Sequence, residues 1–361
     1  MDSPGHGDQF QPLDHPPGPW IDSPRFIEEL EVRSPRFNEM EQSVARDLNQ
    51  QGFTILRGVI PEDLCNQVRT EVEPLFEGDY ARREHRVADG WREGAAAVRD
   101  IAIFSPIQEL LAVMYERKPI PFQTLNFKWG SQQGYHSDSI HFTSIPDRYM
   151  CGVWVALEDV DEQNGPLTYY PGSHRVPQLR AFEPGIEPSR YNQFEATQQE
   201  IMLRLGVQPV ELTAKKGDAL VWTSNLLHGG RPILREGSTR WSQVTHYFFE
   251  DCIYFQPIYS NYLTGEIKLM DIVDLNTLEP VEHRYGSLKV ITTELPNGRK
   301  RFGLVDDAGR EVVGDVTRIH QLESQLAAVT AERDALRGST SFRLGHAVVG
   351  PLDRIRNRIG R

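Results

Sequence analysis

Between about residues 120 and 255 the chain alternates short runs of β-branched and aromatic residues with turns rich in Gly, Pro and Asn. The clearest runs are CGVWVAL (151–157), LTYY (167–170), ALVW (219–222) and WSQVTHYFF (241–249). Because no helical periodicity separates these runs, they predict an antiparallel sandwich or barrel rather than alternating strands and helices. We therefore expect a mainly β fold with some helices.

The segments around this region have different patterns. Residues 1–40 hold six of the 24 prolines before position 25, which predicts a flexible or loosely docked N-terminal arm. From Glu39 a helix is expected that ends at Gly52, followed by the strand FTILRGV (53–59) and by a second helix that opens at Pro61. We place the main domain at residues 41–255.

Three further segments are expected after this domain. Residues 256–315 read as a β-rich extension, with Asn297-Gly298 as a hairpin turn and 307–309 as a second turn. Residues 316–338 carry a heptad pattern that predicts a coiled-coil helix and weak self-association, because an arginine, Arg333, occupies one core position. Residues 339–361 form a basic amphipathic tail of charge +4, from five Arg and one Asp, a pattern that suits either an anionic membrane surface or docking on a partner protein.

The charge balance excludes some function classes. The chain has 361 residues, with 39 Lys and Arg against 51 Asp and Glu, a net charge of -12 that disfavours nucleic-acid binding. It has no apolar stretch of the roughly 20 residues that a membrane span needs, and its polar start does not look like a signal peptide, so we expect a cytoplasmic protein. Cys65, Cys151 and Cys252 match neither a zinc motif nor a disulfide framework and are expected to be reduced core residues.

The chemistry is predicted from two histidines and one aspartate. His136 and Asp138 are two residues apart, so on a strand they would point to the same side. His228, after the strand-like ALVW run, is the strongest candidate for a third ligand. Two imidazoles and a carboxylate on one side of a metal suit an iron(II) site with open positions. A chance coincidence and a zinc-dependent cupin-like enzyme are the alternatives, although a zinc enzyme would give Arg240, 12 residues after His228, no purpose.

With these motifs in this order, the sequence resembles the phytanoyl-CoA dioxygenase (PhyH) family. The resemblance runs over about residues 42–252 and includes HSD (136–138), NGPLTYYPGSHR (164–175), GDALVW (217–222), HGG (228–230) and Arg240. It implies a double-stranded β-helix core, of the jelly-roll or cupin-like kind. It also implies iron(II) at His136, Asp138 and His228, with 2-oxoglutarate and O₂ as co-substrates.

The resemblance extends to the co-substrate. Arg240 would clamp the C5 carboxylate of 2-oxoglutarate, because its planar fork can pair with both carboxylate oxygens. Trp154 falls where family members place an aromatic beside the co-substrate, or it is an ordinary core residue. Lys128 and Gln133 are candidates to reach the same molecule. Asp138 favours hydroxylation or another oxidation over halogenation, since related halogenating enzymes replace this carboxylate with a small residue.

The neighbouring residues are less specific. Tyr135, Ser139, His141 and Phe142 either line a substrate pocket or pack in the core. His174 and His246 are not in ligand spacing, and His246 is the next candidate if His228 is not the third ligand.

The expected function is that of an iron(II)- and 2-oxoglutarate-dependent dioxygenase that hydroxylates a small-molecule, lipid or glycan-linked substrate. The C-terminal tail resembles those of bacterial glycosyltransferases and other cell-envelope polysaccharide enzymes, and we expect it to make peripheral membrane contact. The alternative function is a catalytically silent jelly-roll binding or scaffold protein of a cell-envelope glycan pathway.

Overall fold

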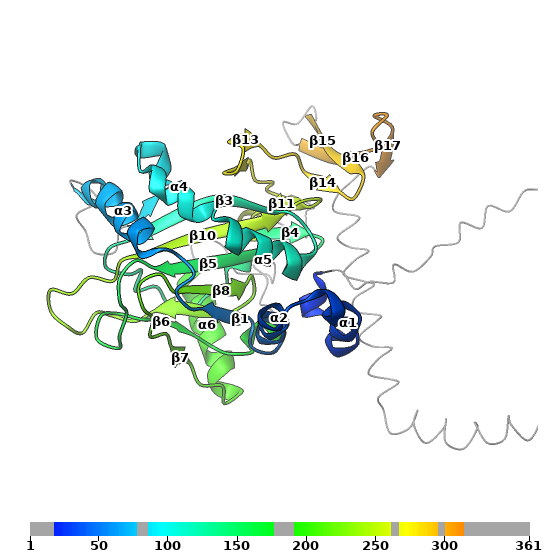
Figure 1. Cartoon of the computed structure of the whole chain (residues 1–361). Helices are drawn as coiled ribbons and strands as arrows, with labels where there is room; N and C mark the ends of the chain where they lie inside the picture. The colour runs from blue at the N-terminus through cyan, green and yellow to red at the C-terminus, as the bar shows by residue number, and fades with distance from the viewer. Residues whose placement is uncertain (1–17, 78–85, 177–190, 261–266, 295–299, 314–361) are drawn as a thin grey trace, which may run out of the picture.

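The computed structural model describes residues 18–77, 86–176, 191–260, 267–294 and 300–313 (Figure 1). Its helices are α1 (Phe26–Arg33), α2 (Glu39–Gln51), α3 (Glu62–Val72), α4 (Ala96–Ala102), α5 (Ser105–Tyr115) and α6 (Tyr191–Arg204). The strands of its main body are β1 (Phe53–Leu56), β2 (Val87–Ala88), β3 (Pro119–Phe127), β4 (Thr143–Ile145), β5 (Met150–Ala156), β6 (Leu167–Tyr169), β7 (Val210–Glu211), β8 (Ala219–Thr223), β9 (His228–Gly230), β10 (Ser242–Phe249) and β11 (Ile253–Phe255).

Two antiparallel sheets face each other in this body. The larger has the strand order β1-β8-β5-β10-β3-β2, and the smaller has the order β7-β6-β9. Aromatic and aliphatic side chains fill the space between them, with Phe53 and Trp222 of the larger sheet in one cluster with Tyr169 of the smaller. This sandwich agrees with the predicted jelly-roll class.

The helices α2 to α5 cover the outer face of the larger sheet. Successive side chains of a strand point to opposite faces, so β10 contributes side chains both to the helical layer and to the space between the sheets. Gln243 and Tyr247 reach the helical layer, where they donate to the carbonyls of Val98 (2.9 Å) and Ala102 (2.7 Å). Val244 belongs to the inner cluster between the sheets. The residues of β10 that share a face with Val244 therefore point into the sandwich.

Within the predicted flexible or loosely docked arm, residues 18–36 are folded and firmly docked. The 3-10 turn Trp20–Asp22 and α1 pack onto the helical layer, and Trp20 is only 5% exposed and stacks on Phe26. The Asn49 amide of α2 donates to the Ile21 carbonyl at 2.7 Å. The prediction relied on the many prolines, which interrupt helical periodicity in the sequence. They do not prevent short helices that bury isolated apolar residues.

Helix α2 has the predicted end points. Asn38 and Glu41 form a reciprocal capping box at its start, with bonds of 2.9 and 2.8 Å. Gly52 ends it with φ 84°, in the left-handed region that favours glycine. The chain then enters β1 directly.

The extension after the body consists of strands, as expected. They are β12 (Val273–Asp274), β13 (Glu279–Pro280), β14 (Arg284–Tyr285), β15 (Leu288–Glu294), β16 (Lys300–Val305) and β17 (Glu311–Val313). Strands β14 to β17 form an antiparallel sheet in sequence order, so β15 and β16 pair on either side of the predicted hairpin turn. The turn itself, at Asn297-Gly298, lies outside the described residues.

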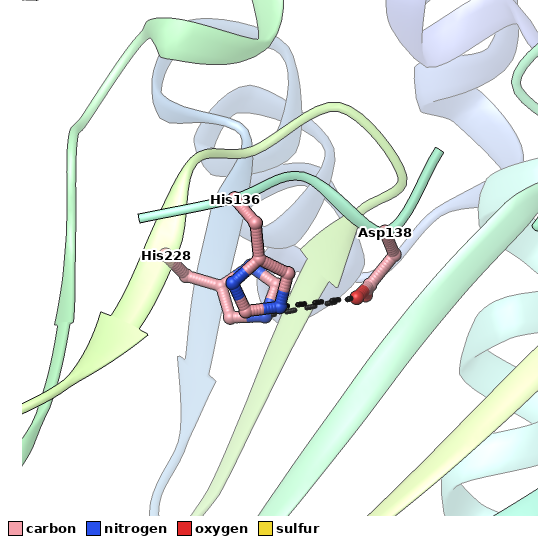
Figure 2. Close-up of side chains that lie close together, drawn as sticks. All are labelled: His136, Asp138 and His228. Carbon is pink, nitrogen blue, oxygen red and sulfur yellow. Dashed lines mark ion pairs between the residues drawn. The ribbon is translucent and has the colours of Figure 1, made fainter. Parts of the chain in front are cut away.

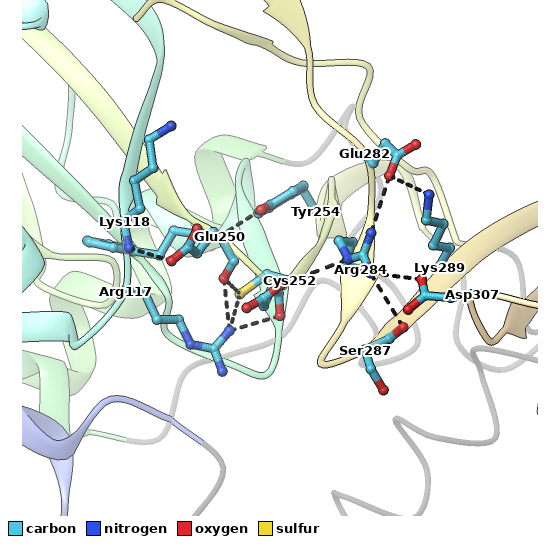
Figure 3. A network of polar contacts seen from close by, with 12 residues as sticks. Arg117, Lys118, Glu250, Cys252, Tyr254, Glu282, Arg284, Ser287, Lys289 and Asp307 are labelled. Carbon is cyan, nitrogen blue, oxygen red and sulfur yellow. Dashed lines mark hydrogen bonds and ion pairs between the residues drawn. The ribbon is translucent and has the colours of Figure 1, made fainter.

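Apolar and polar contacts tie the extension to the body. Leu304 is buried against Ile253 and Phe255 of β11. In the network of Figure 3, the backbone N–H of Arg284 in the extension donates to the carbonyl of Cys252 in the body at 2.9 Å.

Two further predicted segments follow residue 313. The predicted coiled coil (316–338) and basic tail (339–361) lie outside the described residues. Within the described ranges, no helix has both the length and the apolar character needed to cross a membrane.

Candidate metal centre

Backbone pairing brings two of the predicted ligands together. His136 and His228 exchange both of their backbone hydrogen bonds, at 3.0 and 2.9 Å. Their ring centroids are 4.6 Å apart. Asp138 follows at the start of a 3-10 turn, Asp138–Ile140, so the expectation of one strand carrying both His136 and Asp138 is wrong. The three side chains nevertheless converge (Figure 2).

The histidine rings are oriented by backbone carbonyls. Nδ1 of His136 lies 2.9 Å from the Gly134 oxygen, and Nδ1 of His228 lies 3.1 Å from the Leu226 oxygen. A proton on Nδ1 in each ring leaves Nε2 as the free ligand atom. The two Nε2 atoms lie 3.9 and 3.8 Å from Oδ1 of Asp138.

The donor set fits an iron(II) ion. The three ligand atoms lie within 4.8 Å of one another, and all three residues are buried. Two imidazoles and one carboxylate are the ligands of mononuclear non-haem iron oxygenases, and carbonyl bonds of the kind seen here normally support ligating histidines.

The second oxygen of Asp138 is held from the opposite side. The Trp222 indole donates to Oδ2 at 2.6 Å, and Nε2 of His246 lies 3.6 Å from the same oxygen. Nδ1 of His246 in turn lies 3.1 Å from the Gln123 amide oxygen. Oδ1 therefore faces the two histidine ligands while Oδ2 faces the larger sheet. This arrangement makes His246 a neighbour of Asp138 rather than a member of the cluster of three.

A glycine makes room for this indole. Gly152 pairs with Trp222 across β5 and β8, and a Cβ at position 152 would overlap the Trp222 ring. Trp222 could not be recognised from the sequence, because its contact with Asp138 depends on a strand register that only the fold provides.

The surroundings favour a neutral ring at His136 and a charged carboxylate at Asp138. Burial, followed by the nearby His228, lowers the pKa of His136 to about 3, so its ring is neutral and able to bind a metal at physiological pH. Burial alone would raise the pKa of Asp138, but the facing imidazoles, His228 foremost, hold it well below its usual range.

Arg240 lies on the inner face of the larger sheet. It precedes β10 and points to the same side as Ser242 and His246, because these positions are separated by even numbers of residues. Its side chain is 2% exposed and donates to the Ser242 hydroxyl at 2.7 Å, while its Nε is buried with no hydrogen-bond partner. Burial lowers its pKa to about 10, which leaves it positively charged at neutral pH.

The space around the guanidinium is restricted. Gly130, at φ 75°, lies so close that a Cβ there would be 2.6 Å from Nη2 of Arg240. The Arg240 carbon Cζ lies 5.7 Å from the ring centre of Trp154, whose Nε1 is also buried without a partner. A buried cation with an unused N–H group, next to an unused indole N–H, fits a carboxylate ligand.

Two other predicted residues point elsewhere. Lys128 pairs with Glu73 at 2.8 Å and lies 5.4 Å from the ring centre of Trp241 in the helical layer. This corrects the expectation that Lys128 reaches the co-substrate. The physical reason is alternation along the chain, because Phe127 faces the inner cluster and the next residue faces outwards. Gln133 donates to the Tyr191 hydroxyl of α6 at 3.2 Å.

The remaining flanking residues divide between the site and the core. Phe142 contacts His246, with ring centroids 5.1 Å apart, and the His141 ring lies 6.4 Å from that of His136. Tyr135 instead bonds Thr168 at 3.1 Å. His174 contacts the end of α2 rather than the predicted ligands. Its Nε2 lies 3.0 Å from the Asn49 carbonyl oxygen, and its ring lies against Gly52.

The comparisons with known proteins agree with this geometry. Residues 48–240 match the family described as phytanoyl-CoA dioxygenase (PhyH). The chain is similar to peroxisomal phytanoyl-CoA dioxygenase of Bos taurus, with 27% identity over 150 residues that cover 40% of this chain and 41% of the relative. It is 25% identical to the Rattus norvegicus protein over 163 residues, 43% of each chain. The match thus spans about two fifths of the length of the curated relatives.

A solved structure shows the same fold. It is the non-haem α-ketoglutarate-dependent carbocyclase SnoK from nogalamycin biosynthesis, which has 16% identity and a TM-score of 0.50 over 70% of this chain and 96% of its own. The family match covers more than half of the sequence, from α2 to Arg240, and includes every residue of the candidate metal centre. The chain therefore belongs to the phytanoyl-CoA dioxygenase family of iron(II)- and 2-oxoglutarate-dependent oxygenases.

Proposed function

We propose that this protein is an iron(II)- and 2-oxoglutarate-dependent dioxygenase that hydroxylates a small-molecule, lipid or glycan-linked substrate. The observation that carries the proposal is the convergence of His136, Asp138 and His228, all buried and all with one ligand atom within 4.8 Å of the others. Arg240 supplies a second, independent element, because a buried cation with an unused N–H suits the far carboxylate of 2-oxoglutarate.

Each residue has a definite task in this proposal. Nε2 of His136, Nε2 of His228 and Oδ1 of Asp138 would hold iron(II), which supplies the redox chemistry with O₂ and 2-oxoglutarate when it is bound. Trp222 fixes the other oxygen of Asp138 and so limits rotation of the carboxylate. Arg240 orients the co-substrate, and Trp154 lines the space beside it.

The inner cluster gives this site a water-poor environment. Phe127, Trp154 and Val244 are buried there on neighbouring strands. Exclusion of water strengthens the pairing of Arg240 with a carboxylate, and it limits side reactions at the metal. The chain itself provides the binding, the orientation and the dry surroundings.

His228→Ala tests the proposal directly. Wild-type protein loaded anaerobically with iron(II) and 2-oxoglutarate should develop the weak visible charge-transfer band of the chelate, and it should release succinate when oxygen is admitted. His228→Ala should lose iron, band and succinate together. The matched control is His283→Ala, since His283 lies in the extension and accepts a bond from the Tyr254 amide. A folded wild-type protein that binds neither iron nor 2-oxoglutarate would instead indicate the silent scaffold.

Hydroxylation is proposed over halogenation because the carboxylate of Asp138 is present and held by Trp222. Product analysis by mass spectrometry tests this choice, with a gain of one oxygen atom in the substrate as the expected result. Incorporation of chloride would contradict it.

The proposals on location rest on sequence alone. They are a cytoplasmic protein, membrane contact through residues 339–361, and weak self-association through residues 316–338. Liposome sedimentation and light scattering of the full chain, compared with a chain ending at residue 313, test the last two. Equal behaviour of the two proteins in both assays would contradict them.

A further inference from the structure

A group of polar and aromatic side chains lies next to the metal centre on the side of α6. We call Gln133, His141, Tyr191 and Glu195 the α6 cluster. The Tyr191 hydroxyl accepts a bond from the Gln133 amide at 3.2 Å and lies 3.1 Å from Nε2 of His141. The His141 ring lies 6.4 Å from the ring of His136, so the α6 cluster is next to one of the predicted metal ligands.

Glu195 is one helical turn beyond Tyr191 and faces the same neighbours. A Cβ built at Gly134 would lie 3.0 Å from its Oε2, and the carbonyl of Gly134 is the group that orients His136. Oε1 of Glu195 is buried with no hydrogen-bond partner. Burial raises the pKa of Glu195, although bonds to Gln133 and Tyr191 offset part of this rise.

A buried acceptor without a donor calls for a ligand. Leaving such an oxygen unsatisfied is unfavourable, and no lysine or arginine of the described structure pairs with Glu195. A hydroxyl group from a substrate would satisfy it. Burial also raises the pKa of Glu195, and an environment of this kind suits a neutral donor from the ligand, such as a hydroxyl group.

The charges and the ring faces narrow the class of ligand. Arg86 lies close enough to act electrostatically on both His141 and Tyr191, and Glu195 acts on Tyr191 with the opposite sign, so charges of both signs lie around the α6 cluster. This balance disfavours an ammonium compound, which Arg86 would repel, and a carboxylate compound, which Glu195 would repel. The His141 and Tyr191 rings, with centroids 5.2 Å apart, offer apolar faces next to the polar atoms.

We propose that the α6 cluster binds the hydroxyl groups of a neutral, polyhydroxylated substrate, such as a sugar ring, beside the iron. The inference rests on the proposed function and names the substrate class of that same site. Glu195 accepts from one hydroxyl, Gln133 and His141 pair with others, and the ring faces contact the C–H groups. A site built to pair with hydroxyls discriminates strongly against analogues that lack them.

The experiment uses the full chain loaded anaerobically with iron(II) and 2-oxoglutarate. The probes are methyl glucoside, methyl mannoside, methyl galactoside and myo-inositol, with hexylamine and hexanoate as contrasts. A compound that enters beside the metal changes the visible band of the chelate, and the titration gives its Kd. We expect at least one hydroxylated probe to change the band, while hexylamine and hexanoate do not.

The variants assign the effect to the α6 cluster. Glu195→Ala should weaken binding of the responding probe about ten- to hundredfold, as expected for one hydrogen bond to a charged group. Tyr191→Phe should weaken it in the same direction. Glu200→Ala is the matched control on the same helix, because Glu200 is exposed and pairs with Arg204 at 2.7 Å, one turn further along α6.

The outcomes separate the two proposals. A wild-type protein that shows no band with iron(II) and 2-oxoglutarate contradicts the proposed function itself. A normal band that no hydroxylated probe alters contradicts the inference alone. A response to hexylamine that disappears in Glu195→Ala would also overturn the inference, since it would assign the carboxylate to a cationic substrate.

Discussion

Replacing Trp222 by phenylalanine isolates one hydrogen bond to the Asp138 carboxylate. The indole N–H lies 2.6 Å from Oδ2, and Asp138 is only 4% exposed, so water cannot readily replace the lost donor. Phenylalanine keeps an aromatic ring against His228, whose ring centroid lies 4.6 Å from that of Trp222. The change therefore removes the donor while preserving much of the packing.

The size of the effect follows from the charge and burial of the acceptor. A hydrogen bond to a charged group contributes about 1.5 to 3 kcal/mol. Loss of a group that orients a metal ligand typically weakens metal binding about ten- to hundredfold, or about 1.4 to 2.8 kcal/mol. Both figures give the same range, so we expect Trp222→Phe to raise the Kd for iron(II) by one to two orders of magnitude.

The assay is an anaerobic competition titration with a chelating dye. Trp241→Phe is the matched control, because Trp241 is equally buried but packs in the helical layer against Phe76. Circular dichroism and thermal unfolding establish that both variants fold. An unchanged iron Kd in folded Trp222→Phe would refute the argument that this indole orients Asp138.

Three further predictions follow from other residues. Arg240→Lys should raise the Kd for 2-oxoglutarate about ten- to hundredfold while iron content stays constant, and Lys128→Ala should leave both unchanged in the same titration, because Lys128 faces the helical layer. Burial lowers the pKa of His174 from 6.5 to about 4, so the unfolded chain binds a proton that the folded protein does not, and stability falls as the pH drops from 6.5 towards 4. Denaturant unfolding at pH 7 and pH 5 should show that His174→Gln loses about 2 kcal/mol less stability between these pH values than wild type does. Equal losses in the two proteins would contradict this prediction. Trp20→Ala should reduce the free energy of unfolding by about 3 to 5 kcal/mol, whereas a negligible change would support the flexible arm.

The sequence predicted the centre of the site because its signals are local. His136 and Asp138 are two residues apart, and a later histidine and arginine follow the strand patterns that place them on the inner face. The outward direction of Lys128 was also available, since Leu125 and Phe127 alternate with Asn126 and Lys128 as inner and outer positions. That alternation was a stronger signal than the closeness of Lys128 to His136 in the sequence.

Other residues could not be found without the fold. Trp222 contacts Asp138 because Gly152 is its partner on the neighbouring strand, and a strand register of this kind is not readable from one sequence. Tyr191 and Glu195 lie on α6, far along the chain from His141, and no motif connects them. The packing of Trp20 likewise depends on α2 and α5, with which its segment makes tertiary contact.

The division of Asp138 between its two oxygens has a consequence for folding. His228 begins a strand of the smaller sheet, whereas Trp222 and His246, which hold Oδ2, belong to the larger sheet. An ion bound by both His228 and Asp138 would link the smaller sheet to the larger sheet, because Asp138 is hydrogen-bonded to Trp222. Iron at 100 times its Kd would add about 2.7 kcal/mol to the stability of the folded state. The half-life of the protein in a cell would then follow iron supply, so starvation for the metal would reduce the amount of enzyme as well as the activity of each molecule.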